Sequence, residues 1–176
     1  MLTGTDYFQY LGLPQKLEID RGELEARFYS LSRKLHPDLY FERPAPERRL
    51  AEEAAARLND AYRTLKDPIS RAAYLLVLHG VKQDASAAPP ELLDEVFELK
   101  MALEPARAGD AAARAQLAAA KAKFDALLAE SGRSLQAAAA RWDRTGGRDA
   151  LDQIARLLGR RSYIQNLLRD VGAVLE

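Results

Sequence analysis

The stretch that decides the fold is residues 31–38, Leu31-Ser32-Arg33-Lys34-Leu35-His36-Pro37-Asp38. Asp20 stands where a helix cap belongs, and apolar residues then recur at helical spacing, namely Leu24, Phe28, Leu31 and Leu35. Pro37 is expected to end this helix, because the residue before a proline is pushed out of the α region. Taken alone, His36-Pro37-Asp38 is typical of an ordinary helix stop.

The rest of the chain is also predicted to be helical. One stripe ends at Asp67-Pro68 and consists of Ala51, Ala54, Leu58, Ala61 and Leu65. Later helices are expected over about 69–79, 91–104, 110–144 and 148–175, with Pro105 stopping the second of these and Gly132 weakening the third. No stretch alternates with period two and is rich in Val, Ile and Thr, so the fold class is all-α.

Composition excludes several classes of function. The 176 residues include 26 Lys and Arg against 26 Asp and Glu, so a global electrostatic grip on nucleic acid or an anionic membrane is not supported. The chain has no cysteine and two histidines without a nearby ligand set, so no metal site is expected and no cluster held by its own thiolates. No nucleophile with its base and no phosphate loop is recognised, so no catalytic residue and no cofactor is predicted. No targeting or membrane-spanning segment is recognised, and a cytoplasmic protein is expected.

The flanks of the tripeptide give it a more specific meaning. Upstream stands Asp6-Tyr7-Phe8-Gln9-Tyr10-Leu11-Gly12-Leu13, and downstream follow Leu58-Asn59-Asp60-Ala61-Tyr62-Arg63-Thr64-Leu65 and Asp67-Pro68-Ile69-Ser70-Arg71-Ala72-Ala73-Tyr74. In this order and spacing the segments resemble the J-domain of DnaJ-type co-chaperones over about residues 6–80. We therefore expect a J-domain at 1–80, a linker at 81–90 and a second domain at 91–176.

The resemblance implies a helical hairpin with accessory helices that displays the His36-Pro37-Asp38 loop to a DnaK-type ATPase chaperone. In that family the aspartate engages the ATPase domain, and basic residues of the second helix meet an acidic patch. The residues that match are His36, Pro37 and Asp38, together with Arg27, Arg33 and Lys34. For the three basic residues a merely solvated helix face is the alternative.

The second half resembles the HscB branch, which pairs a J-domain with a C-terminal three-helix domain, here a three-helix bundle. The resemblance rests on Tyr74-Leu75-Leu76-Val77-Leu78-His79-Gly80 and on Leu92-Leu93-Asp94-Glu95-Val96-Phe97-Glu98-Leu99-Lys100-Met101. It implies that an IscU-type iron–sulfur scaffold protein binds at Leu93, Asp94, Phe97, Glu98, Met101 and Tyr163. Asp94 stands where the family usually has methionine, and Met101 where glutamate is frequent.

The helix from about residue 91 carries two apolar stripes. The first serves the core of the predicted bundle and consists of Leu92, Val96, Leu99 and Leu103. The second consists of Leu93, Phe97 and Met101, and one stripe already suffices for a three-helix bundle. The second stripe therefore indicates a partner surface, while packing on the J-domain or a wider core remains the alternative.

Two classes of function stay open. In the first, the protein is a dedicated adaptor that binds the cluster scaffold and the ATPase at once. In the second, it is a general J-domain co-chaperone whose helical domain serves a different client or oligomerisation. Whether the ATPase is a dedicated HscA-type chaperone or an ordinary DnaK is likewise open.

Overall fold

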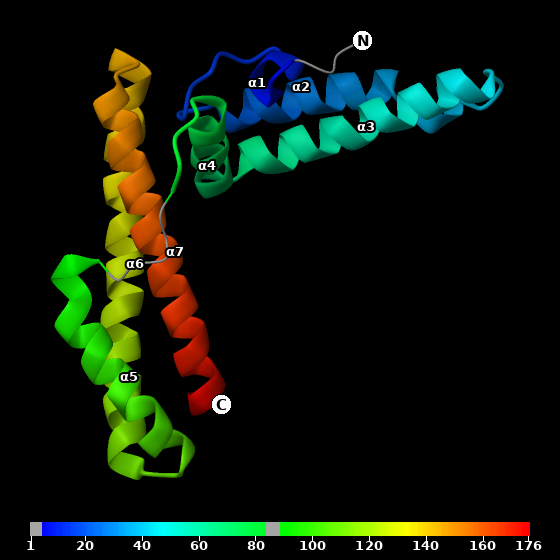
Figure 1. The fold of residues 1–176 in the computed structure, drawn as a ribbon. Coiled ribbons are helices and arrows are strands. Elements are labelled where there is room, and N and C mark those ends of the chain that lie inside the picture. The colour runs from blue at the N-terminus through cyan, green and yellow to red at the C-terminus, as the bar shows by residue number, and fades with distance from the viewer. Residues whose placement is uncertain (1–4, 84–88) are drawn as a thin grey trace. The chain divides into compact units, whose positions relative to one another are not determined.

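The computed structural model describes residues 5–83 and 89–176, and over these ranges it contains helices and no strand. The all-α class expected from the sequence is confirmed. The α-helices are α1 (Tyr7–Tyr10), α2 (Arg21–Lys34), α3 (Ala45–Lys66), α4 (Pro68–Leu78), α5 (Leu93–Arg107), α6 (Ala111–Thr145) and α7 (Arg148–Leu175) (Figure 1). The same ranges contain two 3-10 helices, η1 (Pro37–Tyr40) between α2 and α3 and η2 (Pro90–Leu92) directly before α5.

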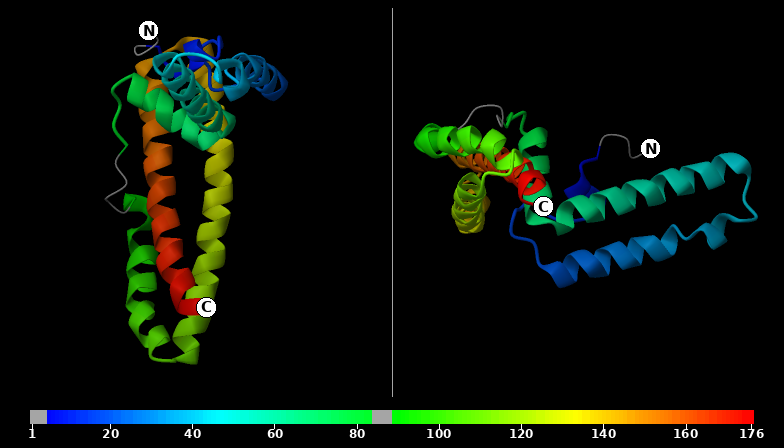
Figure 2. Two further views of the ribbon diagram at one scale, coloured as in Figure 1. Left: turned by 90° about the vertical axis from the view of Figure 1, so that its right-hand side faces the viewer. Right: turned by 90° about the horizontal axis from the view of Figure 1, so that it is seen from below.

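The chain divides into two compact units. Unit 1 consists of residues 1–80 and 142–146, and unit 2 of residues 81–141 and 147–176. In unit 1, α2 and α3 run side by side as an antiparallel hairpin (Figure 2). In unit 2, α5, α6 and α7 form a three-helix bundle. The predicted linker at 81–90 lies partly outside the described residues, which omit 84–88.

Helix α2 begins and ends where the sequence predicts. The side chain of Asp20 accepts a hydrogen bond from the backbone N–H of Glu23 at 2.6 Å, so it caps the helix. The helix ends at Lys34, before Pro37. Of its predicted stripe only Leu24 is fully buried, since a hairpin covers one narrow side of α2.

The predicted stripe of α3 supplies most of the hairpin's core, with Ala51, Leu58, Ala61 and Leu65 buried. Helix α4 then packs back on α3, and its Arg71 is buried. The Arg71 guanidinium donates to the backbone carbonyl of Leu65 at 2.6 Å. This bond satisfies a carbonyl in the last turn of α3 that has no helical donor.

One prediction for α5 is wrong, namely its end before Pro105. The helix starts at Leu93, after the 3-10 turn η2, and it runs through Pro105 to Arg107 rather than stopping before the proline. Pro105 has no N–H for the carbonyl of Met101, four residues earlier, so the helix loses one bond there. Bonds from Ala108 to Glu104 and from Asp110 to Pro105 close the helix end.

Helices α6 and α7 form the long part of the bundle. Helix α6 is continuous through Gly132, so the packing of the bundle outweighs the low helix propensity of glycine at this position. Phe124 of α6 and Ile164 of α7 are fully buried in the core of unit 2. Arg114 of α6 donates to the last carbonyls of α7, Val174 at 2.8 Å and Leu175 at 2.9 Å. This cation therefore caps the C-terminal end of α7.

Candidate functional site

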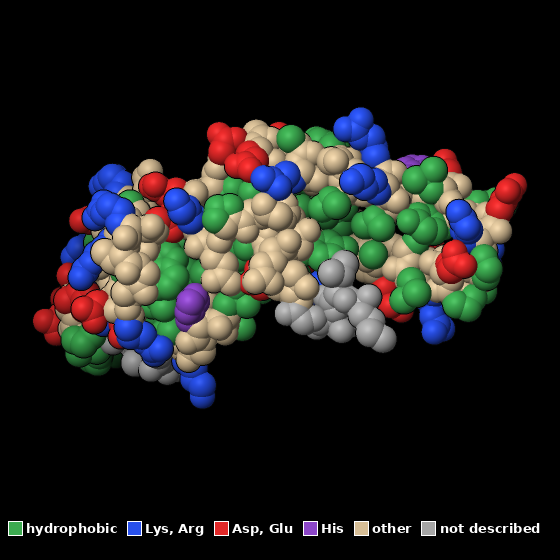
Figure 3. Space-filling view, turned by 90° about the horizontal axis from the view of Figure 1, so that it is seen from above, with side chains coloured by type: hydrophobic (Ala, Val, Ile, Leu, Met, Phe, Trp, Pro, Cys, Tyr) green, Lys and Arg blue, Asp and Glu red, His purple; other side chains and the backbone are tan. Residues whose placement is uncertain are grey.

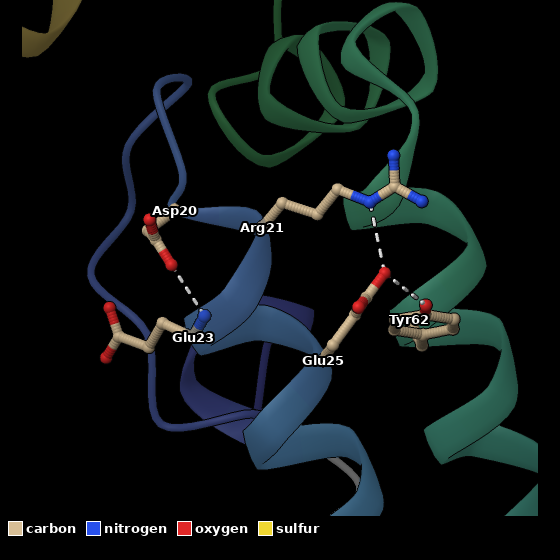
Figure 4. Close-up of polar contacts among 5 residues, drawn as sticks. All are labelled: Asp20, Arg21, Glu23, Glu25 and Tyr62. Atoms are coloured by element: carbon tan, nitrogen blue, oxygen red, sulfur yellow. Dashed lines mark hydrogen bonds and ion pairs between the residues drawn. The ribbon is translucent and has the colours of Figure 1, made fainter.

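At the base of the hairpin in unit 1, Tyr62 of α3 contacts α2 through both its hydroxyl and its ring. Arg21 pairs with Glu25 at 3.0 Å, and the hydroxyl of Tyr62 in α3 donates to the same carboxylate at 3.5 Å (Figure 4). One turn further along, the ring of Phe28 stacks on the ring of Tyr62. These contacts hold α2 against α3 and so position the loop that joins them.

That loop carries His36, Pro37 and Asp38, all of which are exposed. His36 caps η1, and its Nδ1 accepts a hydrogen bond from the backbone N–H of Asp38 at 3.3 Å. The same Nδ1 lies 3.4 Å from the Asp38 carboxylate. The backbone contact needs an unprotonated Nδ1, and the carboxylate contact becomes an ion pair only when His36 is protonated. The imidazole is turned toward Asp38, whose carboxylate is 87% exposed and can bind a partner.

The three basic residues of α2 differ in their surroundings. Arg27 donates twice to Glu23, at 3.0 and 2.7 Å. The Arg27 guanidinium also lies close to Gly12, because a Cβ added to that glycine would be 2.8 Å from it. Arg33 and Lys34 are exposed in the last turn of α2, next to the loop. Over residues 5–83 and 89–176 neither of them forms a salt bridge. The structure thus brings Arg33 and Lys34 to the loop and leaves Arg27 two turns away.

In unit 2 the two stripes of α5 separate as the sequence predicts. Leu92, Val96 and Leu99 are buried in the bundle core, and Leu103 is partly buried against it. The side chains of the second stripe are between 53% and 65% exposed, and they are Leu93, Phe97 and Met101. A wider core is therefore excluded as the reason for the second stripe.

Two carboxylates flank this exposed stripe. Asp94 and Glu98 lie on the same helix, are exposed, and form no salt bridge in the part of the chain that the structure describes. Phe97 and Met101 also border a hollow that extends to Pro105 and to the first turn of α6. Five of the six predicted scaffold-binding residues thus share one exposed surface of α5.

The sixth predicted residue, Tyr163, has different surroundings. It lies on α7 and is partly buried against the core of the bundle. Its hydroxyl makes no hydrogen bond within the described residues. Tyr163 therefore mainly packs against the bundle core, and part of its surface is exposed to solvent.

Sequence reasoning missed three large apolar side chains that the structure leaves exposed after the His36-Pro37-Asp38 loop and in the first turns of α3. Leu39, Phe41 and Leu50 are all exposed. The signal was present in the sequence, since large apolar residues stand among charged ones and prolines between 39 and 50. No helical period connects them, so periodicity alone could not assign them to core or surface.

Residues 5–83 and 89–176 contain neither a candidate metal site nor a candidate membrane span. No group of three or more His, Cys, Asp or Glu side chains is placed to hold a metal ion there. No helix of those ranges is both long and apolar enough to cross a membrane.

Comparison with known families divides the chain in two. Residues 6–74 match the model of the DnaJ domain, and residues 88–172 match that of the HSCB C-terminal oligomerisation domain. The first match contains α1 to α3, the first part of α4 and the His36-Pro37-Asp38 loop, and the second contains α5, α6 and most of α7.

Individual relatives agree with these matches. The co-chaperone protein HscB homolog of Bordetella pertussis is 36% identical over 135 residues, which cover 73% of this chain and 79% of that one. The iron–sulfur cluster co-chaperone protein HscB homolog of Arabidopsis thaliana is 42% identical over 103 residues, but the match spans 57% of this chain and only 41% of the plant protein. Several bacterial relatives match over 60% of their length.

A solved structure extends the similarity to nearly the whole chain. Chaperone HscB from Vibrio cholerae superposes with a TM-score of 0.72 at 32% sequence identity. The match covers 96% of this chain and 97% of that one. The similarity therefore includes both units.

Proposed function

We propose, from the premise that this chain belongs to the HscB family of J-domain co-chaperones, that it links an ATPase chaperone of the DnaK or HscA type to an IscU-type iron–sulfur scaffold protein. The proposal assigns residues 1–80 to the J-domain, 81–90 to a linker and 91–176 to the scaffold-binding domain. The observation that carries it is the exposed His36-Pro37-Asp38 loop at the end of a braced hairpin. In this proposal the protein activates its partner's ATPase and is not itself an enzyme.

The loop is the contact with the ATPase. The Asp38 carboxylate is open to a cationic or hydrogen-bond-donating group of the partner, and Pro37 fixes the backbone between it and His36. Arg33 and Lys34 add two uncompensated positive charges next to the loop, which favours an acidic patch on the partner. Arg27 can join them only by exchanging its bond to Glu23.

The exposed stripe of α5 is the contact with the scaffold. Leu93, Phe97 and Met101 supply the apolar centre, and a flexible methionine beside an aromatic ring suits a partner groove. Asp94 and Glu98 form a charged edge that selects donors on the scaffold. Tyr163 contributes the part of its ring that the core leaves open.

Joining the two contacts in one chain gives the proposed mechanism. A scaffold held by unit 2 is present near the ATPase chaperone at a high effective concentration, so its binding there becomes an intramolecular event. Stimulation of hydrolysis by the loop then couples scaffold capture to the ATPase cycle. The cluster is cargo of the scaffold.

We place the protein in the cytoplasm, as its bacterial relatives and its composition suggest.

Single-turnover ATP hydrolysis tests this function. A purified DnaK-type ATPase loaded with ATP is mixed with the full-length chain, with and without purified scaffold. The wild-type chain should accelerate hydrolysis, and Asp38→Asn or His36→Gln should abolish the acceleration while scaffold binding by calorimetry is unchanged. Both residues are exposed on a loop, so neither change removes core contacts. Glu42→Gln, an exposed charge change six residues past His36, is the matched control and should behave as wild type.

The outcomes separate the alternatives. Full stimulation by Asp38→Asn would contradict the J-domain function. Stimulation that depends on Asp38 without any scaffold binding would favour a general J-domain co-chaperone that serves a different client.

A further inference from the structure

A groove runs between α5 and α6 in unit 2, next to the exposed stripe of α5. Two hollows form it. The first lies beside Phe97 and Met101 and reaches the first turns of α6. The second continues along α6 as far as Lys123. Glu98 of α5 and Gln116 of α6 line both hollows, so the hollows meet at these two side chains.

One bank of the α5–α6 groove belongs to the exposed stripe. Phe97 and Met101 both line the first hollow, and both are more than half exposed. Large apolar side chains that lie together in the open usually mark an interaction surface. Because the same two side chains border the groove, a protein that covers the stripe also reaches the groove. The occupant that this continuity favours is the protein that binds the stripe.

The opposite wall of the groove is one face of α6. It includes Ala112, Gln116, Ala119 and Lys123, which follow one another at spacings of four, three and four residues and so share a side of the helix. Gln116 is exposed, and its side chain forms no hydrogen bond within residues 5–83 and 89–176. Its amide is therefore free to bind a partner through its oxygen or its nitrogen.

The uncompensated charge at the groove is negative. Glu98 has no salt-bridge partner in the part of the chain that the structure describes. The nearby cations are already engaged, since Lys123 pairs with Glu95 at 2.7 Å and Arg114 binds the last carbonyls of α7. Over the hairpin of unit 1, by contrast, acidic and basic side chains are interspersed, as Figure 3 shows at the right of its view. A free carboxylate beside a free amide oxygen is suited to a cationic group, because both accept hydrogen bonds from it.

We infer that the scaffold-binding surface extends across this groove onto α6, and that Glu98 and Gln116 together receive a basic side chain of the scaffold. This inference rests on the proposed function. The aliphatic stem of such a side chain packs along Phe97 and Met101, while its charged end reaches the pair. The pair therefore sets selectivity: a partner without a cation at this point would cover Glu98 and leave its charge unpaired, which costs affinity.

The experiment is a calorimetric titration of the full-length chain with a purified IscU-type scaffold protein. Gln116→Lys places a positive charge beside the basic side chain, so it should lower the affinity about tenfold. Gln116→Glu adds a second carboxylate and should raise the affinity about threefold. Gln116 is exposed and makes no contact that either change would break, so circular dichroism melts should stay near wild type.

Ala118 is the matched control position. It is exposed two residues further along α6 and lines neither hollow. Ala118→Lys changes the net charge by the same amount as Gln116→Lys and should bind the scaffold as wild type does. Raising the concentration of NaCl separates charge from bulk. The loss caused by Gln116→Lys should shrink, because salt screens exposed charges. A loss that is independent of salt would mean obstruction of the groove and would refute the basic occupant.

Other outcomes overturn the inference in distinguishable ways. If the wild-type chain binds the scaffold and both Gln116 variants bind it equally well, α6 lies outside the interface and the proposed function stands. Equal losses in Gln116→Lys and Ala118→Lys would assign the effect to net charge, and tighter binding by Gln116→Lys would mean an acidic occupant. If the wild-type chain does not bind the scaffold, the proposed function itself fails.

Sedimentation tests a second copy of this chain as the occupant of the groove. A wild-type dimer that Gln116→Lys dissociates, with unchanged affinity for the scaffold, would assign the groove to self-association instead.

Discussion

The ring of Phe28 in α2 stacks on the ring of Tyr62 in α3, with the centroids 4.2 Å apart and the planes inclined by 21°. The pair joins the two helices that carry the His36-Pro37-Asp38 loop. Lys66 approaches the same Tyr62 ring, with its Nζ 5.1 Å from the centroid. The stacking of Phe28 on Tyr62 therefore helps to hold α2 against α3.

We expect Tyr62→Ala to destabilise the hairpin by about 2 kcal/mol or more, because it removes a half-buried ring and the stacking contact of that ring with Phe28. Urea denaturation followed by far-UV circular dichroism measures the loss. Tyr62→Phe is the matched control. It keeps the ring and removes only the long 3.5 Å bond to Glu25, so its stability should be near wild type. Equal losses for both variants would assign the stabilisation to the hydroxyl instead.

The exposed stripe of α5 gives the second prediction. Leu93→Ala combined with Phe97→Ala should weaken scaffold binding by about 2 kcal/mol or more, roughly thirtyfold, as apolar anchors at an interface centre do. Because both side chains are more than half exposed, the melting temperature should change little. Titration calorimetry and thermal melts on one sample test both statements.

The core stripe of the same helix supplies the control. Leu99→Ala removes a side chain that is 1% exposed, so it should cost about 2–5 kcal/mol of stability. The folded fraction of this variant should still bind the scaffold. Normal scaffold binding by the Leu93/Phe97 variant would refute the assignment of the stripe.

Local signals in the sequence predicted much of the fold and of the site. Asp20 and the proline at 37 fix the ends of α2, since a capping side chain and a missing N–H act within one turn. The division of α5 into a buried stripe with Leu99 and an exposed stripe with Phe97 follows from helical geometry alone.

What the sequence could not predict depends on tertiary contacts. Pro105 was expected to end α5, but in the bundle Ala102 and Ala106 on either side of it are buried, and this burial outweighs one lost hydrogen bond. Glu23 and Arg27, by contrast, are four residues apart in α2, so their ion pair did have a local signature in the sequence. The groove between α5 and α6 needs two segments brought together and has no local signature.

The ion pair between α5 and α6 predicts a dependence of stability on pH. Lys123 donates to the Glu95 carboxylate at 2.7 Å, and this hydrogen bond is the main cause that lowers the pKa of Glu95 from its ordinary value of 4.5. A carboxyl with a lowered folded-state pKa stabilises the protein above its unfolded-state pKa. The contribution is then lost as the pH falls through the lowered value.

We therefore expect Lys123→Gln to reduce the melting temperature slightly at pH 7, and the difference from wild type to shrink as the pH falls below 4.5. Thermal melts from pH 7 to pH 3 measure it. Lys100→Gln on α5 is the control, because Lys100 forms no salt bridge among the residues the structure describes. Its difference from wild type should not follow the titration of Glu95. A Lys123→Gln difference that persists unchanged at pH 3 would contradict the pairing.

Gly132 gives the last prediction, because it lies inside the continuous helix α6 with open space around it. A Cβ added there meets no atom within 4 Å, and the backbone is helical. Alanine at this position should stabilise unit 2 by about 0.5–1 kcal/mol, since glycine loses more backbone entropy on folding than alanine does.

Gly109 is the matched control within the same unit. It has equally open surroundings, but its φ is +93°, a conformation that residues with a Cβ rarely adopt. Gly109→Ala should therefore destabilise by about 1 kcal/mol or more. Urea denaturation of the two variants beside wild type should move the midpoint in opposite directions. A loss of stability in Gly132→Ala would mean that α6 is interrupted at this residue in solution, because only a non-helical backbone would turn the added methyl group into a cost where no neighbour obstructs it.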